Sequence, residues 1–350
     1  MISFCNDYCV GACQEVLNAL NDINQIQFSG YGLDEICEQT KKAIQKEMNH
    51  FDCDIHFLVG GTQANTVVIK SLLRPHEAVI ACDSGHINVH ETGSIEAVGH
   101  KVLTAKHQDG KLLASDVEKI VLMHKDEHMV KPKMVYISNA TEYGTIYSLE
   151  ELQSLRKVCD QYGLYLFLDG ARLASALMSV ENNISMSDLA QLCDVFYIGG
   201  TKNGALFGEA VVILNNALKS GFRYIMKQHG AMLAKGWLLG LQFKVLFEDE
   251  LYFKLANHAN QLAQQLQLEL KNRGVEFLIQ SSTNQIFPIV SNALMNKLAE
   301  NFKFEIWEPV SETHTCIRFV CSFASTQAQV DELLENFKSK NSGYHINLMS

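Results

Sequence analysis

Between residues 55 and 215, short apolar segments alternate with segments of helical periodicity, and this alternation constrains the fold more than any other feature. The apolar segments are 78–82, 101–104, 134–138, 164–168, 195–198 and 210–214. The helical patterns are 62–73, 91–98, 114–124 and 149–162. Continuous apolar strands separated by helices are typical of a mainly parallel sheet covered on both faces. We therefore expect an α/β fold that binds its ligand at the carboxyl ends of the strands.

A different pattern follows residue 215. It predicts a long helical region at 216–273, strands at 277–280, 285–290, 304–306 and 316–319, and a terminal helix at 326–338. This order is typical of a smaller α+β domain, and the amphipathic segment 15–20 is expected to pack against it. Since a chain of 350 residues exceeds what one core usually organises, we expect two domains. The large one is expected at 20–245, and the small one at 1–19 and 246–350.

Composition and charge narrow the class of protein. A formal net charge of −10 argues against general affinity for nucleic acid or anionic membrane. No apolar run approaches the roughly 20 residues of a membrane span, and the N-terminus lacks a secretory signal pattern. The ten cysteines do not follow zinc-ligand spacing, so we interpret them as reduced thiols. These observations predict a cytoplasmic protein without a metal site.

The most informative residue is Lys202, in the segment Gly-Gly-Thr-Lys-Asn-Gly at 199–204 that follows the apolar run 195–198. A lysine between glycine-rich turns at the end of a buried strand is poorly explained by a solvated face. Desolvated lysine amines are nucleophilic and form imines with carbonyl cofactors. We therefore expect Lys202 to be a catalytic nucleophile.

Three further features fall where the same sheet could bring them together. Gly61 and Thr62 lie in Gly-Gly-Thr-Gln-Ala-Asn at 60–65, which could hold a phosphate group or form a plain capped turn. Asp169 follows the strand 164–168 and could pair with a protonated ring nitrogen or cap the next helix. His86 follows the strand 78–82 and could cover a cofactor ring and relay protons, or bond to backbone. Glu91 could orient His86 or cap a helix.

Taken together, an imine-forming lysine, an acid for a pyridine nitrogen, a phosphate cradle and a ring cover are the parts of a pyridoxal phosphate site. The sequence therefore predicts that Lys202 forms an imine with pyridoxal 5′-phosphate.

These segments resemble those of the low-specificity threonine aldolases of the β-eliminating lyase family, which are pyridoxal phosphate enzymes. The resemblance implies an aspartate aminotransferase-like fold with a mainly parallel seven-stranded sheet and a smaller α+β domain. It implies that Gly61 and Thr62 contact the phosphate, with Thr201 next to the imine lysine. It also implies that His86 stacks on the ring, that Asp169 holds the ring nitrogen and that Arg172 contacts the cofactor or the substrate carboxylate.

Other roles rest on the resemblance alone. His128, before the strand 134–138, is similar to a second active-site histidine, and Arg318 is similar to an arginine that binds the substrate carboxylate. Tyr31 lies in a segment similar to one that reaches a neighbouring subunit's site. Such sites form between subunits, so a homodimer or homotetramer is implied. Leu233 departs from the family, which has an arginine there for the partner's phosphate; Lys227 and Lys235 are candidates to replace it.

The expected activity is cleavage of threonine or allo-threonine to glycine and an aldehyde, with His86 or His128 removing the β-hydroxyl proton. Rival interpretations within the cofactor class are a β-eliminating lyase, a racemase or an aminotransferase. Interpretations of another class are a non-catalytic regulatory relative and an unrelated α/β protein that binds a phosphate ligand. The sequence leaves the natural substrate and its Cβ stereochemistry open.

Overall fold

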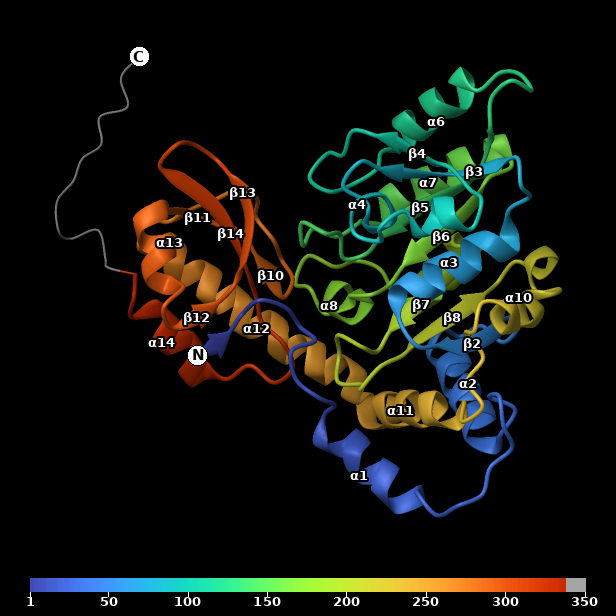
Figure 1. Cartoon of the computed structure of the whole chain (residues 1–350), viewed down its shortest axis with the longest axis horizontal. Helices are drawn as coiled ribbons and strands as arrows, with labels where there is room; N and C mark the ends of the chain where they lie inside the picture. Colours follow the sequence, from blue (N-terminus) through green and yellow to red (C-terminus); the bar gives the residue numbers. More distant parts are fainter. Residues whose placement is uncertain (338–350) are drawn as a thin grey trace.

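The centre of the molecule is a seven-stranded sheet in the computed structural model, which describes residues 1–337 (Figure 1). Its strand order is β2-β8-β7-β6-β5-β3-β4. The strands are β2 (Asp54–Leu58), β3 (Glu77–Cys82), β4 (Val102–Ala105), β5 (Lys131–Ser138), β6 (Tyr165–Asp169), β7 (Val195–Gly199) and β8 (Glu209–Ile213). Strand β8 alone runs opposite to the other six. The predicted fold, a mainly parallel seven-stranded sheet flanked by helices, is confirmed.

Helices cover both faces of this sheet, which explains why its strands are apolar throughout. One face packs against α3 (Gly61–Leu72) and α10 (Phe222–Gln228). The other face packs against α2 (Glu35–Glu47), α6 (Ala114–Met123), α7 (Leu149–Tyr162), α9 (Met186–Leu192) and α11 (Trp237–Phe247). Three shorter helices, α4 (His86–Val89), α5 (Ser94–Ala97) and α8 (Leu173–Leu177), follow strands β3 and β6.

Two predicted helices are shorter than expected. The pattern at 91–98 forms α5 alone, because Gly93 takes a left-handed conformation with φ of 70° before it. The region 216–273 is divided into a short 3₁₀ turn (Asn216–Leu218), α10, α11, a second 3₁₀ turn (Glu248–Glu250) and α12 (Leu251–Asn272). Gly221 and Gly230, with φ of 82° and 67°, flank α10 and end the helical pattern there.

The small domain contains a five-stranded sheet, in which β14 (His314–Val320) pairs with β10 (Gln285–Ile286), β11 (Pro288–Ser291) and β13 (Glu305–Pro309). Strand β9 (Glu276–Phe277) extends it beyond β11. Helices α12, α13 (Asn292–Leu298) and α14 (Gln327–Leu334) pack on this sheet. The predicted end of the terminal helix at Lys338, and the small domain beyond it, lie outside the described residues.

The N-terminal segment belongs to both domains. Strand β1 (Ile2–Ser3) pairs with β12 (Phe302–Lys303), and Phe4 lies in the core of the small domain. Helix α1 (Gln14–Ile23) instead packs on α11, and Cys13 and Val16 lie in the core of the large domain. The expectation that 15–20 packs on the small domain is therefore wrong, and the N-terminal boundary that we propose lies between Phe4 and Cys13 rather than at residue 19.

None of the helices within residues 1–337 has the length and apolar character needed to cross a membrane.

Candidate active site

The candidate site lies where four parallel strands end. Asp169 is the last residue of β6 and pairs in register with Ser138, the last residue of β5. Lys202 follows the end of β7 by three residues, and His86 begins α4 after the end of β3. Because β3, β5, β6 and β7 run parallel, these residues share one edge of the sheet.

Asp169 is a buried carboxylate held by several donors. Its Oδ2 accepts hydrogen bonds from the Tyr136 hydroxyl at 2.5 Å and from Asn65 Nδ2 at 3.2 Å, and its Oδ1 accepts one from the Ala171 backbone at 2.9 Å. Burial acts to raise the pKa of Asp169, but His86 and hydrogen bonds from Tyr136 and Tyr197 hold the pKa below its ordinary value. The group is therefore an anion, as a partner for a protonated nitrogen requires.

His86 is tied to Asp169 through two intermediate side chains. Glu91 Oε1 lies 2.7 Å from His86 Nδ1 and accepts from Asn65 Nδ2 at 2.7 Å, while Asn65 also donates to Asp169. Glu91 Oε2 accepts from the Ser94 hydroxyl at 2.7 Å. Glu91 thus fixes the orientation of the His86 ring, the first of the two roles considered from the sequence.

Lys202 is enclosed, and the burial of its amine together with the Arg172 guanidinium lowers its pKa. Glu209, the first residue of antiparallel β8, reaches the same edge, and burial raises its pKa to about 8. The Thr201 hydroxyl donates to Glu209 Oε1 at 2.8 Å, and the Gly200 backbone donates to Oε2 at 3.2 Å. These surroundings favour the neutral amine, which is the nucleophilic form.

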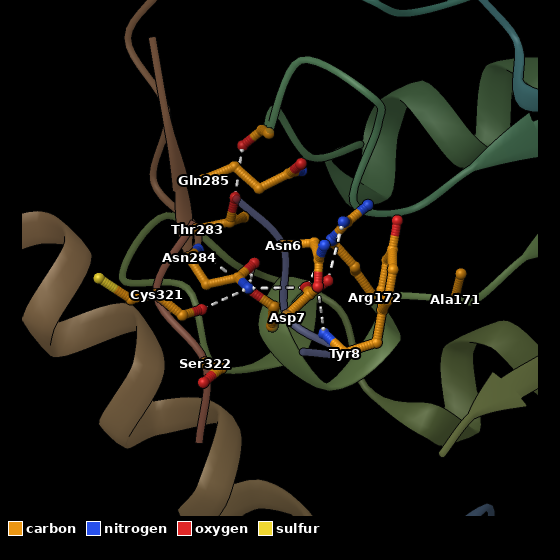
Figure 2. A network of polar contacts seen from close by, with 12 residues as sticks. Asn6, Asp7, Tyr8, Ala171, Arg172, Thr283, Asn284, Gln285, Cys321 and Ser322 are labelled. Carbon is orange, nitrogen blue, oxygen red and sulfur yellow. Dashed lines mark hydrogen bonds and ion pairs between the residues drawn. The ribbon is translucent and has the colours of Figure 1, made fainter. Parts of the chain in front are cut away.

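Arg172 belongs to a polar network in which Asp7 joins three separate segments (Figure 2). Its Nε donates to Asp7 Oδ2 at 2.7 Å and its Nη2 donates to Asp7 Oδ1 at 3.0 Å. Asn284, from the small domain, donates to Asp7 Oδ2 at 2.9 Å. Burial acts to raise the pKa of Asp7, but Arg172 and Lys202 lower it. Arg172 therefore uses two nitrogens for this pair and lines a small cavity together with Asp7 and Lys202.

Arg318 lies on β14 of the small domain with its guanidinium over the Trp307 ring, 5.2 Å from the ring centre. It donates to the Glu305 carboxylate and, through Nη1, to Gln285 Oε1 at 3.2 Å. Its Nε is buried without an acceptor among residues 1–337. A buried guanidinium with an unused donor suits a carboxylate ligand.

The start of α3 carries Gly61 and Thr62. Within residues 1–337, no side chain caps this helix, so its first-turn N–H groups are open to an anion. Gly61 also lies against Tyr197, because a Cβ there would be 3.0 Å from the Tyr197 hydroxyl. Thr62 is exposed.

Two predicted site residues lie elsewhere in this chain. The His128 side chain is 90% exposed and precedes β5, whereas the site lies at the other end of that strand, about 23 Å away at 3.3 Å per residue. The expectation that His128 joins Lys202 is therefore not met. Tyr31 is exposed, with φ of 61°, and contacts Lys227 and Arg223 rather than Lys202. Leu233 packs partly buried against the large core.

Sequence reasoning missed two acids, Glu142 and Glu209. Glu142 follows the rule that revealed Asp169, since it comes soon after the end of β5. Glu209 does not, because it begins β8 and reaches the site only through the antiparallel pairing of β8 with the end of β7. Glu142 accepts hydrogen bonds from the Ser138 hydroxyl at 2.8 Å and from the His86 backbone at 3.0 Å.

The fold is aspartate aminotransferase-like. An aspartate aminotransferase of Thermus thermophilus superposes with a TM-score of 0.71 at 13% identity, over 96% of this chain and 91% of that one. The chain belongs to the beta-eliminating lyase family, whose family model matches residues 7–293. It is 31% identical to the low specificity L-threonine aldolase of Pseudomonas sp. over 96% of this chain and 97% of that protein. A Leishmania major threonine aldolase structure has a TM-score of 0.95 and 46% identity, covering 96% of this chain and 98% of that one.

Proposed function

We propose that this lyase is a pyridoxal phosphate-dependent aldolase that cleaves threonine-type β-hydroxy amino acids to glycine and an aldehyde. The observation that carries the proposal is the buried amine of Lys202 at the same sheet edge as the ionised Asp169. The similarity to threonine aldolases over nearly the whole chain supports cleavage of a carbon–carbon bond over the other reactions of this cofactor.

The residues present fit the cofactor on structural grounds. Lys202 would hold it, the first turn of α3 at Gly61 and Thr62 would bind its phosphate, and Asp169 would keep a proton on its ring nitrogen. His86, fixed by Glu91, would cover the ring, and Thr201 would set the position of Lys202 through Glu209. When bound, pyridoxal phosphate supplies an electron-accepting ring that stabilises negative charge at the amino-acid α-carbon.

The substrate carboxylate would be bound by Arg318, through the Nε that has no acceptor in the described chain, and by the Arg172 nitrogen that does not pair with Asp7. A carboxylate fixed at two guanidinium groups orients the Cα–Cβ bond for cleavage. We further propose a cytoplasmic homodimer or homotetramer that acts in threonine breakdown and glycine formation. Tyr31 would then reach the partner's site, and Lys227 or Lys235 would replace the arginine absent at Leu233.

Product analysis tests the function. The purified protein with pyridoxal phosphate should release acetaldehyde and glycine from threonine or allo-threonine, and benzaldehyde from phenylserine. Borohydride should fix the cofactor to Lys202, and Lys202→Ala should abolish both the fixation and the aldehyde, while Lys271→Ala, an exposed lysine at the end of α12, should change neither. Release of no aldehyde would exclude the aldolase, and pyruvate with ammonia from a β-substituted substrate would identify a β-eliminating lyase instead.

A further inference from the structure

Glu142 places a carboxyl group beside the candidate site without a role in holding the cofactor. Its side chain is buried and follows β5, and its Oε1 accepts from the Ser138 hydroxyl at 2.8 Å and the His86 backbone N–H at 3.0 Å. Among residues 1–337, no donor from another residue is bonded to Oε2. One oxygen is thus anchored to the two strand ends that carry the site, and the other is open to a ligand.

Glu142 lines a cavity of about 260 Å³. It lies between the segment after β3, at His90, and strand β13 of the small domain, at Glu305 and Trp307. Glu305 and Trp307, which line this cavity, also contact the Arg318 guanidinium that we propose for the substrate carboxylate, so the cavity lies next to that group. A bound amino acid that contacts Arg318 would place its β-substituent in the same space.

The surroundings suit Glu142 to proton transfer. Burial raises its pKa, and the hydrogen bond from Ser138 partly opposes this effect. Its charged and titratable neighbours on the site side are His86, Asp169, Tyr136, Tyr147, Cys82 and Arg172, and those facing the cavity are His90, Tyr143, Glu305 and Glu308. A carboxyl group whose pKa approaches the working pH exchanges protons more effectively than an exposed one.

We propose that Glu142 is the group that takes the proton from the substrate's β-hydroxyl. The inference rests on the proposed aldolase function. As the O–H bond breaks, the proton moves to Glu142 and the O–H electron pair forms the carbonyl double bond of the aldehyde. The Cα–Cβ electron pair would remain on the α-carbon, as the negative charge that pyridoxal phosphate would stabilise when bound. The α-carbon then takes up one proton to give glycine and Glu142 releases one, so the reaction is balanced without a further co-reactant.

Glu142→Gln is the main test, because a glutamine oxygen still accepts from Ser138 and His86 while the side chain no longer accepts the proton. Cleavage of threonine should fall by about 10²- to 10⁴-fold. Exchange of the glycine α-proton with deuterated solvent needs Lys202 and the cofactor but no β-hydroxyl, so it should stay close to the wild-type rate. Cofactor absorption should be unchanged.

Two further readouts separate proton transfer from a structural role. In Ser138→Ala the acidic limb of the cleavage rate should move to higher pH, since the lost hydrogen bond lowered the Glu142 pKa. Infrared difference spectra of the cofactor-free wild type should contain a carboxylic acid band that titrates with pH and is missing in Glu142→Gln.

The outcomes are distinct. Near-normal cleavage by Glu142→Gln, or parallel loss of cleavage and glycine exchange, would overturn the role of Glu142. A wild-type enzyme that exchanges the glycine proton but yields no aldehyde from any β-hydroxy amino acid would overturn the proposed function instead.

Discussion

At the scale of single residues, the charge state of buried groups determines what the site can do. Asp169 is ionised although it is enclosed, because Tyr136, Asn65 and the Ala171 backbone donate to it. In Asp169→Asn the side chain keeps its shape but loses the charge that would hold a proton on the cofactor's nitrogen. We expect kcat for threonine cleavage to fall by about 10²-fold or more, as for other electrostatic contacts to a reacting group. Borohydride should still fix the cofactor to Lys202; an unchanged kcat would contradict the role of Asp169.

His56, on β2, is another residue whose pKa is shifted. Its ring packs against Phe222 of α10, its Nε2 is buried without a partner in the described chain, and burial lowers its pKa to about 3. The buried ring of His56 therefore lacks a hydrogen bond at Nε2 that would favour its protonated form.

The lowered pKa of His56 predicts that the folded protein loses stability as the pH falls. In the unfolded chain, His56 binds a proton once the pH falls below its pKa of about 6.5. In the folded chain it stays neutral until the pH falls to about 3. Stability should therefore fall as pH falls through this window, by up to about 1.4 kcal/mol per pH unit from this group. His56→Phe should flatten the fall of the thermal unfolding midpoint between pH 6.5 and 4, whereas His76→Phe, an exposed position, should not. Equal slopes in the two variants would refute the assignment.

Site residues could be predicted from sequence where one strand end defines them. We predicted Lys202, Asp169 and His86 because each follows an apolar run. The same rule could have predicted Glu142, which follows β5. His128 precedes its strand, so the rule itself places it at the wrong edge of the sheet. Asp7 could not be found in this way, because its partner Arg172 is 165 residues away in the chain and only folding brings the two together.

At the scale of elements, local signals set helix starts more precisely than helix lengths. The α7 bounds agree with the predicted 149–162, because Ser148 and Glu151 form a capping box at its start and Gly163, with φ of 65°, ends it. The prediction of a long helical region after residue 215 was wrong, because glycines interrupt its pattern. The predicted strand at 285–290 divides at Phe287 into β10 and β11, which both pair with β14. Apolar periodicity does not register such breaks.

The α7 cap provides a stability prediction. The Ser148 hydroxyl accepts from the Glu151 backbone at 3.3 Å, and Glu151 also binds Lys111. Ser148→Ala should lower the free energy of unfolding by about 1 kcal/mol, without changing kcat. Ser154→Ala, at an exposed position inside the same helix, is the matched control and should be neutral or slightly stabilising, because alanine is the better helix former. Denaturant titration of both variants measures this; equal losses would show that the cap has no special effect.

At the scale of the whole molecule, helix α12 and the N-terminal segment connect the two domains. Helix α12 runs from the large domain into the small one (Figure 1). Its residues Tyr252 and Ala256 belong to the large core, and Leu262 and Leu266 belong to the small core. The Asp7–Arg172 pair forms a second connection, because Asn284 of the small domain binds the same carboxylate. Substrate contacts proposed at Arg172 and Arg318 lie on opposite sides of this junction, so its rigidity bears on how the carboxylate is oriented.

Breaking the Asp7–Arg172 ion pair should destabilise the contact between the two domains. Asp7→Asn leaves the buried Arg172 without its counter-ion, which typically costs about 3–5 kcal/mol. Asn284→Ala leaves that ion pair intact but removes side-chain hydrogen bonds with Asp7, Ser175 and the Cys321 carbonyl, and should cost about 1–3 kcal/mol. Asp52→Asn, at an exposed pair with Lys219, is the control and should leave the unfolding midpoint unchanged. Because the pair orients Arg172, KM for threonine should rise in Asp7→Asn more than in Asn284→Ala. Equal unfolding midpoints for Asp7→Asn and Asp52→Asn would show that the domains are held together by the α12 packing alone.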